Sequence, residues 1–304
     1  MIKKTLCFSN PAYLSLKNRQ LVIKSETTDT DPVTIPIEDI GVVVLDHQQI
    51  TITHGALSAL LDNNAAVVTC NGQHLPVGLM LPLEGNTIQS ERFQNQIGAS
   101  LPLRKQLWQQ TVEQKIRNQA TLLQSIPGVE TGNMLHWASE VRSGDSTNLE
   151  GRAAAYYWSR LMPSIDNFTR GRDGDFPNPL FNYGYAILRA VIARALVGSG
   201  LLPTLGIHHH NRYNAYCLAD DIMEPYRPFV DRLVLQILEQ MPDEQELTVA
   251  VKRTLLTLPT TEVHIAGQRS PLMVAANRTT ASLAKCFSGE SRKITYPVLH
   301  GPIQ

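Results

Sequence analysis

The sequence has few cysteines, no excess charge and no long apolar run, and each absence narrows the class of protein. Its four cysteines lie far apart and form no Cys-x-x-Cys pair, which predicts reduced, mostly buried thiols and argues against a cysteine zinc site. No apolar run reaches the ~20 residues that a membrane-spanning helix needs. The N-terminus starts with basic residues but has no long apolar region and no cleavage site, so we expect a cytoplasmic protein.

The charges also cancel. With 27 basic and 27 acidic side chains, the chain cannot carry a uniformly basic nucleic-acid-binding surface, although local patches are compatible with this balance. From residue 263 onward a single acid, Glu290, stands against five basic side chains, which are Arg269, Arg278, Lys285, Arg292 and Lys293. This basic tail is consistent either with a phosphate-contacting patch or with a solvated helix face.

The chain changes character along its length. At 304 residues, 43% hydrophobic and 18% charged, it is a globular sequence large enough for one large domain or two smaller ones. Short apolar runs separated by turn residues predict strands at 5–8, 13–16, 21–24, 33–37, 41–45, 65–70 and 76–81, with a short helix at 54–61. Helical spacing then predicts helices at 103–123, 133–142, from 147 onward, and at 178–197, 216–238 and 272–287.

This pattern predicts an α+β protein. We expect a small N-terminal β-rich domain over residues 1–82, a linker over 83–98, and an all-α C-terminal catalytic domain over 99–304. The linker is assigned because it is the polar stretch that carries turn residues between the two patterns.

The densest group of chemistry-bearing side chains lies between residues 206 and 231. Three consecutive histidines precede three acids that helical spacing places near one face, namely His208, His209, His210, Asp220, Asp221 and Glu224. Like charges so spaced repel one another, and a metal ion or an arginine would remove the repulsion. The segment therefore suggests a cation site, although any one histidine taken alone is also consistent with an ordinary surface or core residue.

Some of these features have local structural explanations. Thr147 and Glu150 fit a capping box, in which the glutamate folds back onto the N-cap backbone N–H. Pro225 and Pro228 lack an N–H inside the expected helix. Either they kink it and turn Glu224 toward the histidines, or the helix begins near Pro225 and the acids lie in the preceding turn.

Three separated fragments resemble, in order, the signature of one family. Residues 148–158 resemble E-G-x-A-A-x-x-Y-F/W, residues 178–185 resemble N-x-x-L-N-Y-G-Y, and residues 206–231 resemble G-x-x-H…L…D-L-M-E-x-x-R-P-x-V-D. This set is similar to the CRISPR adaptation integrase, the metal-dependent nuclease-like subunit of the spacer-acquisition complex. Residues 10–14 and 40–45 extend the resemblance nearly end to end, toward the branch found with single-protein, RNA-guided effector (type II) systems.

The resemblance implies a metal centre. Its catalytic residues and metal ligands would be Glu150, His209 and Glu224. A slip of one residue in the alignment would select His208 or His210 instead of His209. Supporting roles around the ligands fall to Asp221, Asp220 and His208. Two carboxylates and one imidazole suit Mg²⁺ or Mn²⁺, whereas zinc is more often held by additional histidine or by cysteine.

The resemblance also implies a reaction and partners. The 3′-OH of a short DNA fragment would attack the boundary of a CRISPR repeat, inserting a new spacer, and with water in its place the site would be an endonuclease. Phosphate contacts would come from Arg152, Arg170, Arg172, Arg212, Arg227 and the basic tail. The implied assembly on double-stranded DNA is a homodimer with a small ferredoxin-like subunit, with the RNA-guided effector nuclease as a further candidate partner and no membrane.

Two other functions fit parts of the sequence. A zinc or manganese hydrolase built on His208, His209 and His210 would act on a small substrate and would not bind DNA. A non-catalytic scaffold would keep the fold and hold DNA without joining it. The presence of all three ligand types argues against the scaffold.

Overall fold

The structure is a computed structural model that describes residues 3–26, 30–163, 165 and 168–301. The chain divides into two compact units, Met1–Thr87 and Ile88–Gln304. The division falls inside the segment 83–98 that the sequence suggested as a linker, and helix α2 (Gln89–Ile97) occupies much of that segment.

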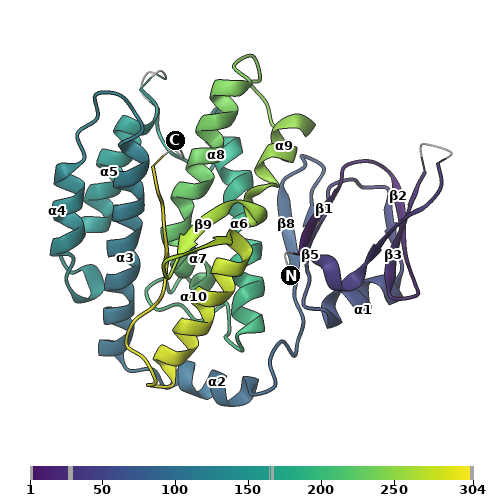
Figure 1. The fold of residues 1–304 in the computed structure, drawn as a ribbon, viewed down its shortest axis with the longest axis horizontal. Helices are drawn as coiled ribbons and strands as arrows, with labels where there is room; N and C mark the ends of the chain where they lie inside the picture. The colour runs from purple at the N-terminus through teal and green to yellow at the C-terminus, as the bar shows by residue number, and fades with distance from the viewer. Residues whose placement is uncertain (1–2, 27–29, 164, 166–167, 302–304) are drawn as a thin grey trace. The chain divides into compact units, whose positions relative to one another are not determined.

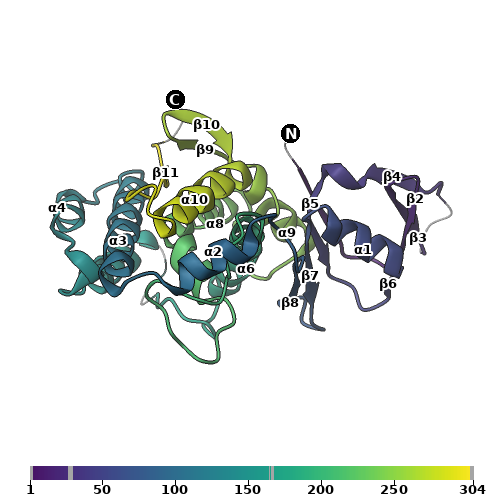
Figure 2. The same cartoon turned by 90° about the horizontal axis from the view of Figure 1, so that it is seen from below.

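In the described residues, two four-stranded sheets, one α-helix and one short 3₁₀ turn build the first unit. One sheet has the order β1 (Lys4–Phe8), β5 (Ile40–Leu45), β7 (Ala66–Cys70) and β8 (Pro76–Met80). The other has the order β4 (Val33–Pro36), β3 (Gln20–Ser25), β2 (Ala12–Lys17) and β6 (Ile50–Ile52). Helix α1 (His54–Asp62) packs against β2 and β7, between the two sheets (Figure 2). The β-rich N-terminal region predicted from the sequence is confirmed.

Helices dominate the second unit (Figure 1). After α2 they are α3 (Leu101–Leu123), α4 (Gly132–Glu140), α5 (Leu149–Leu161), α6 (Asn178–Gly198), α7 (Cys217–Met223), α8 (Arg227–Gln240), α9 (Val249–Leu255) and α10 (Leu272–Phe287). Short 3₁₀ turns lie at Ser143–Asp145 (η2), Glu224–Tyr226 (η3) and Leu258–Thr260 (η4), and η1 (Ile37–Asp39) belongs to the first unit.

The expectation that this second part is all-α is wrong. It contains a three-stranded antiparallel sheet in the order β10 (Gln268–Pro271), β9 (Glu262–Ile265) and β11 (Pro297–Val298). Ala266 and Gly267 both have positive φ, the backbone that a two-residue hairpin turn requires. Val263 and Ile265 alternate with exposed or half-exposed neighbours, a period-2 signal too short to stand out beside the long helices.

Helix α6 is the core element of the second unit. By length and composition it could cross a membrane, but 78% of its apolar window is buried inside the protein. It contacts α7, α8, α9 and α10. A Cβ at Gly184 would lie 2.4 Å from Val230 Cγ1, so the glycine of the Asn-Tyr-Gly-Tyr segment allows α8 to pack closely against α6.

Helix α3 is unusual because its buried face carries polar side chains. Ser100 caps the helix by accepting a hydrogen bond from Leu103 N. Further along, the fully buried amide of Asn118 donates to the carbonyl oxygens of Pro225 (2.7 Å) and Pro297 (3.1 Å), and accepts from Leu299 N (3.0 Å). One side chain of α3 therefore ties the turn after Glu224 to the segment that follows α10.

Candidate functional site

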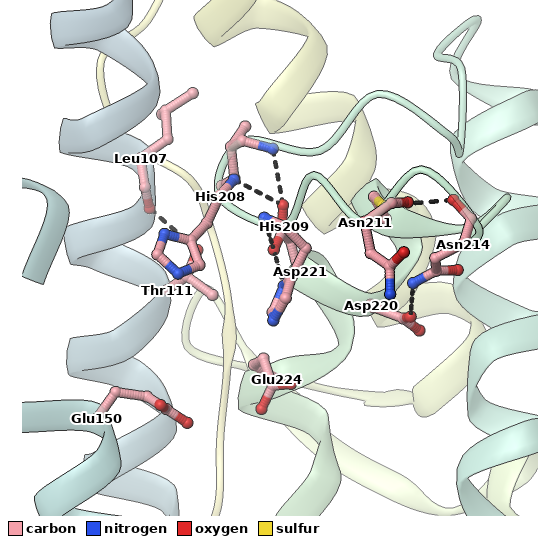
Figure 3. A network of polar contacts seen from close by, with 12 residues as sticks. Leu107, Thr111, Glu150, His208, His209, Asn211, Asn214, Asp220, Asp221 and Glu224 are labelled. Carbon is pink, nitrogen blue, oxygen red and sulfur yellow. Dashed lines mark hydrogen bonds and ion pairs between the residues drawn. The ribbon is translucent and has the colours of Figure 1, made fainter. Parts of the chain in front are cut away.

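The two predicted glutamate ligands reach one space from different elements. Glu150 lies in the first turn of α5, and Glu224 begins the 3₁₀ turn η3 between α7 and α8. The histidine run precedes α7, and α3 passes beside all of them. Figure 3 shows the ring of His209 directed toward Glu224, with Glu150 on the facing side.

The prolines explain how Glu224 is placed. Pro225 lies in the first turn of η3 and Pro228 in the first turn of α8. A backbone N–H in a first turn has no intrahelical acceptor, so proline removes no hydrogen bond at these positions. The segment expected as one helix over 216–238 is therefore two helices with a tight 3₁₀ turn between them, and Glu224 stands at the break. The sequence left two arrangements open, a helical segment interrupted at the prolines or a helix that begins only near Pro225. The structure shows the first.

Glu150 does not cap its own helix, so the capping box predicted with Thr147 is wrong. The N-cap of α5 is Asn148, whose backbone is left-handed (φ 52°) and whose side chain accepts from Gly151 N. The carboxylate of Asp145 accepts from the backbone N–H groups of Leu149 and Glu150, each at 2.9 Å. Because these two residues satisfy the helix end, the side chain of Glu150 is free to face the site.

A buried lysine joins the two glutamates. The ammonium of Lys115, on α3, contacts Glu150 Oε1 and lies 2.6 Å from Glu224 Oε2. Only 8% of the Lys115 side chain is exposed. The other oxygen of Glu224 accepts from Arg227 Nε at 2.9 Å. Sequence reasoning missed Lys115, although a lysine three positions after Val112 on the apolar face of α3 was an available signal.

This cluster remains charged inside the protein. Burial raises the pKa of the Glu224 carboxyl, but Arg227 and Lys115 outweigh it and bring that pKa down to about 2. Burial also lowers the pKa of Lys115, yet the charges of Glu224 and Glu150 more than compensate, and the pKa lies above its ordinary value. Two carboxylates and two cations therefore form a balanced ionic group.

Asp221 holds the histidine loop. Its carboxylate is fully buried and accepts from the backbone N–H groups of Ile207 (2.7 Å), His208 (2.9 Å) and His209 (3.2 Å). His209 Nδ1 lies 2.5 Å from Asp221 Oδ1. A carboxylate only accepts, so Nδ1 carries a proton and Nε2 is left available as a ligand. The hydrogen bond with Asp221 raises the pKa of His209, against the effect of burial.

The other two histidines are held differently. The ring of His208 stacks on Trp108 with a centroid separation of 4.1 Å and an interplanar angle of 3°. Burial and the neighbouring His209 lower the pKa of His208. His210 lines a pocket whose described lining includes His209 but neither Glu150 nor Glu224. Of the three, His209 has the carboxylate partner that metal-binding histidines usually have.

Asp220 anchors the far end of the same loop. It forms a two-pronged ion pair with Arg189, at 2.7 and 3.0 Å. It also accepts a hydrogen bond from Asn214 Nδ2 at 2.7 Å (Figure 3). The consecutive acids of α7 thus face different partners, one holding His209 and the other the residues before the helix.

The residues present fit a divalent cation. Among the residues that the structure describes, no three His, Cys, Asp or Glu side chains form a ready metal-binding group. The ammonium of Lys115 instead stands as a positive charge between Glu150 and Glu224. The space between these carboxylates therefore accommodates a positive charge, and carboxylate oxygens are ligands that suit a divalent cation.

Two pockets flank this site. A pocket of about 410 Å³ lies on the histidine side and is lined by His209, His210, Arg104 and Arg212 among others, and no acid is present among the described residues of its wall. A second pocket of about 360 Å³ lies on the glutamate side and contains the site residues Lys115, Glu150 and Glu224, together with Arg170, Arg172 and Arg227. Both approaches to the candidate site are thus lined by arginine.

An aromatic and amide network supports the second pocket. Tyr157 and Tyr185 donate to the two oxygens of buried Asp231 at 2.6 and 2.5 Å, and burial raises the pKa of Asp231 to about 6. Arg170 donates to the side-chain oxygens of Asn178 (3.0 Å) and Asn182 (2.7 Å). The residues of the Asn-Tyr-Gly-Tyr segment therefore position a guanidinium at the pocket.

The suggested DNA-contacting residues differ in whether their side chains are engaged by neighbouring groups of the protein or exposed to solvent. The guanidinium of Arg227 is committed to Glu224, and that of Arg152 lies 4.5 Å from the ring centre of Trp137. Arg269 pairs with Glu262 at 3.4 Å. The remaining candidates outside the network just described are exposed, namely Arg172, Arg212, Arg278, Lys285, Arg292 and Lys293.

Comparison with known proteins places the chain in a family. The family model described as "CRISPR associated protein Cas1" matches residues 6–261. A CRISPR-associated endonuclease Cas1 of Neisseria meningitidis is 38% identical over 299 residues, covering 96% of this chain and 95% of the relative. A second Cas1 endonuclease, from Pyrobaculum aerophilum, is 29% identical over 269 residues, covering 83% and 89%.

Solved structures share the fold. A casposase bound to integration product superposes with a TM-score of 0.81 at 21% identity, covering 96% of this chain and 92% of the casposase. A CAS1 protein from Thermotoga maritima gives 0.73 at 16% identity, covering 99% and 100%. The match along nearly the whole sequence, together with this shared fold, shows that the chain belongs to the Cas1 family of CRISPR associated proteins.

Proposed function

We propose that this chain is the metal-dependent DNA integrase and endonuclease that inserts short DNA fragments, as new spacers, into a CRISPR array. The single observation that carries the proposal is that Glu150 and Glu224 share one cation-accepting space beside His209. Family membership and the named endonuclease relatives support nuclease chemistry on DNA.

The metal would be Mg²⁺ or Mn²⁺, held by Glu150, Glu224 and His209 Nε2. When bound, such an ion stabilises the charge that develops on a phosphodiester under attack and favours the deprotonated form of a hydroxyl nucleophile. The chain's own residues prepare the ligands for this role. Arg227 keeps Glu224 ionised, and Asp221 fixes the tautomer and direction of His209. Through its hydrogen bonds to the loop backbone, Asp221 also limits how far His209 can move.

The DNA would approach through the arginine-lined pockets. Strand transfer joins two DNA molecules, so the site must admit two backbones, and the presence of two pockets, one lined by His209 and the other by Glu150 and Glu224, suits that need. Arg170 and Arg172 line one, Arg104 and Arg212 the other. The casposase relative is described with an integration product, and one Cas1 relative is described as a DNA complex, which supports DNA as the substrate.

Binding to DNA through phosphate contacts predicts a strong dependence on salt. Log K should fall linearly with log salt concentration, and Arg172→Gln should make the slope shallower by about 0.9. Arg117→Gln is the matched control, because Arg117 already pairs with Glu113 at 2.9 Å and lies outside both pockets. Equal duplex affinity at low and high salt in fluorescence anisotropy would contradict the idea.

The proposed assembly is a cytoplasmic homodimer that works with a small ferredoxin-like subunit and, as a further candidate, the RNA-guided effector nuclease of a type II system. One structural relative is described as a Cas6-RT-Cas1–Cas2 complex, which supports a multi-subunit assembly. The alternatives of a histidine-rich hydrolase and of an inactive scaffold have less support. The ring of His208 stacks on Trp108 and does not complete a histidine cluster, and the three ligand types are retained.

The test is strand transfer into a supercoiled plasmid that carries a CRISPR repeat. The reaction contains a short duplex with free 3′-OH ends, Mn²⁺ or Mg²⁺, and the small partner subunit. Wild type is compared with Glu150→Gln, Glu224→Gln and His209→Ala, with His210→Ala as the control from the same loop. Joined product that requires the metal and is lost in the first three variants but kept in the control supports the proposal. Wild-type protein that binds DNA but never joins it would favour the scaffold.

A further inference from the structure

Lys115 occupies a position that the proposed function does not use. Its ammonium touches one oxygen of each glutamate, and its side chain is almost fully buried on α3. We propose that Lys115 is an internal cation which holds Glu150 and Glu224 together in the metal-free protein and competes with a divalent ion for both carboxylates. The inference rests on the proposed function, because it takes these glutamates as metal ligands.

Charge balance carries the first step. The two glutamates supply two negative charges, and Lys115 and Arg227 already neutralise them. A divalent ion added beside both cations would leave two excess positive charges in a buried space, where repulsion is poorly screened. Of the two glutamates, Arg227 contacts only Glu224. Lys115 contacts both, at the position that a shared metal ion would occupy. Metal binding is therefore linked to release of the Lys115 ammonium.

The geometry provides a place for the released side chain. Lys115 lines the glutamate-side pocket of about 360 Å³, whose wall also carries Arg170 and Arg172. A lysine side chain has four rotatable bonds, so its ammonium can rotate into this pocket while α3 stays fixed. There it would join two guanidinium groups and face an incoming phosphodiester. The same residue would thus stabilise the ligands before metal binding and attract the anionic substrate afterwards.

Direct metal binding tests the linkage without DNA. Free Mn²⁺ is measured by electron paramagnetic resonance during titration of wild type, Lys115→Met and Lys105→Met, the last being a lysine exposed on the same helix. We expect Lys115→Met to bind Mn²⁺ at least about tenfold more tightly than wild type, and Lys105→Met to match wild type. Glu224→Gln should abolish this binding, which assigns it to the site. Equal or weaker Mn²⁺ binding by Lys115→Met would overturn the proposal.

A measurement on the wild-type chain covers the case in which Lys115→Met fails to fold. The protons of a buried, ion-paired ammonium exchange slowly with water, so Lys115 and the equally buried Lys252 should each give a ¹⁵N signal without metal, and we expect one of the two signals to disappear on titration with Mg²⁺. Two signals that persist at saturating Mg²⁺ would overturn the displacement of Lys115 while leaving the proposed function intact. Wild type that binds neither Mn²⁺ nor Mg²⁺ would overturn both.

Discussion

Replacing Asp221 by asparagine changes one oxygen to an NH₂ group and tests how His209 is prepared. In wild type, Oδ2 accepts from the backbone of Ile207 and His208, and Oδ1 accepts from the backbone and the ring of His209. The asparagine oxygen can serve one of these pairs. If it keeps the two backbone donors at Oδ2, its NH₂ group faces His209, which must then accept at Nδ1 and carry its proton on Nε2. The variant therefore blocks the nitrogen proposed to bind metal.

The size of the effect follows from the bonds that are lost. The backbone N–H of His209 loses its hydrogen bond to a charged acceptor, which contributes about 1.5–3 kcal/mol when buried, and the ring keeps only a neutral hydrogen bond from the new NH₂ group. The His209 side chain is 46% exposed, so we count mainly its backbone bond and expect a loss of about 2–3 kcal/mol. In a unit of this size that corresponds to a fall in Tm of about 4–12 °C. Loss of the carboxylate that orients a metal-binding histidine should weaken Mn²⁺ binding about 10–100-fold.

Three measurements check this prediction. Thermal unfolding in EDTA gives the stability change, long-range ¹H–¹⁵N correlation of the His209 ring gives the tautomer, and Mn²⁺ titration gives the affinity. Asp220→Asn is the neighbouring control, since Asp220 contacts Arg189 and Asn214 rather than His209. A variant in which His209 keeps its proton on Nδ1 and binds Mn²⁺ as tightly as wild type would refute the reasoning.

Two further predictions concern stability. The pKa of Glu224 falls from 4.5 unfolded to about 2 folded, so its charge stabilises the fold by about 3 kcal/mol above pH 4.5, and this is lost as pH falls through about 2. Urea unfolding at pH 6 and pH 3 should therefore show a smaller acid loss in Glu224→Gln than in wild type, by about 2 kcal/mol, and equal losses would contradict the assignment. Gly184→Ala should lower stability by about 1–3 kcal/mol in the same assay, because its Cβ would lie 2.4 Å from Val230 Cγ1. Gly132→Ala, where a Cβ meets nothing within 4 Å, should have no such effect, and a similar loss in both would point to a cause other than packing.

The sequence correctly predicted those helices and strands whose boundary signals lie next to them in the chain. Helix α10 spans the expected residues 272–287, since Pro271 precedes it and Gly289, with φ 81°, follows it. The strands of the first unit were found for the same reason, except the three-residue strand β6, which was not predicted. In the sheet β10-β9-β11, the hairpin β9–β10 was missed because its four-residue strands give too short a period-2 signal, and β11 was missed because its two residues, Pro297–Val298, carry no periodicity.

The site was predictable as a set of residue types but not as an arrangement. Glu150 fitted a capping box in sequence, and only the structure shows that Asn148 and Asp145 satisfy that helix end. Lys115 is 35 residues from Glu150, so no local pattern joins them. The choice of His209 depended on alignment, whereas its physical distinction is the contact with Asp221.

The buried amide of Asn118 gives the segment after α10 a role in the mechanics of the site. That amide holds the carbonyl of Pro225, directly after Glu224, and also the carbonyl of Pro297. Residues 297–299 therefore help to hold in place the peptide that follows a proposed ligand, although they lie more than seventy positions further along the chain.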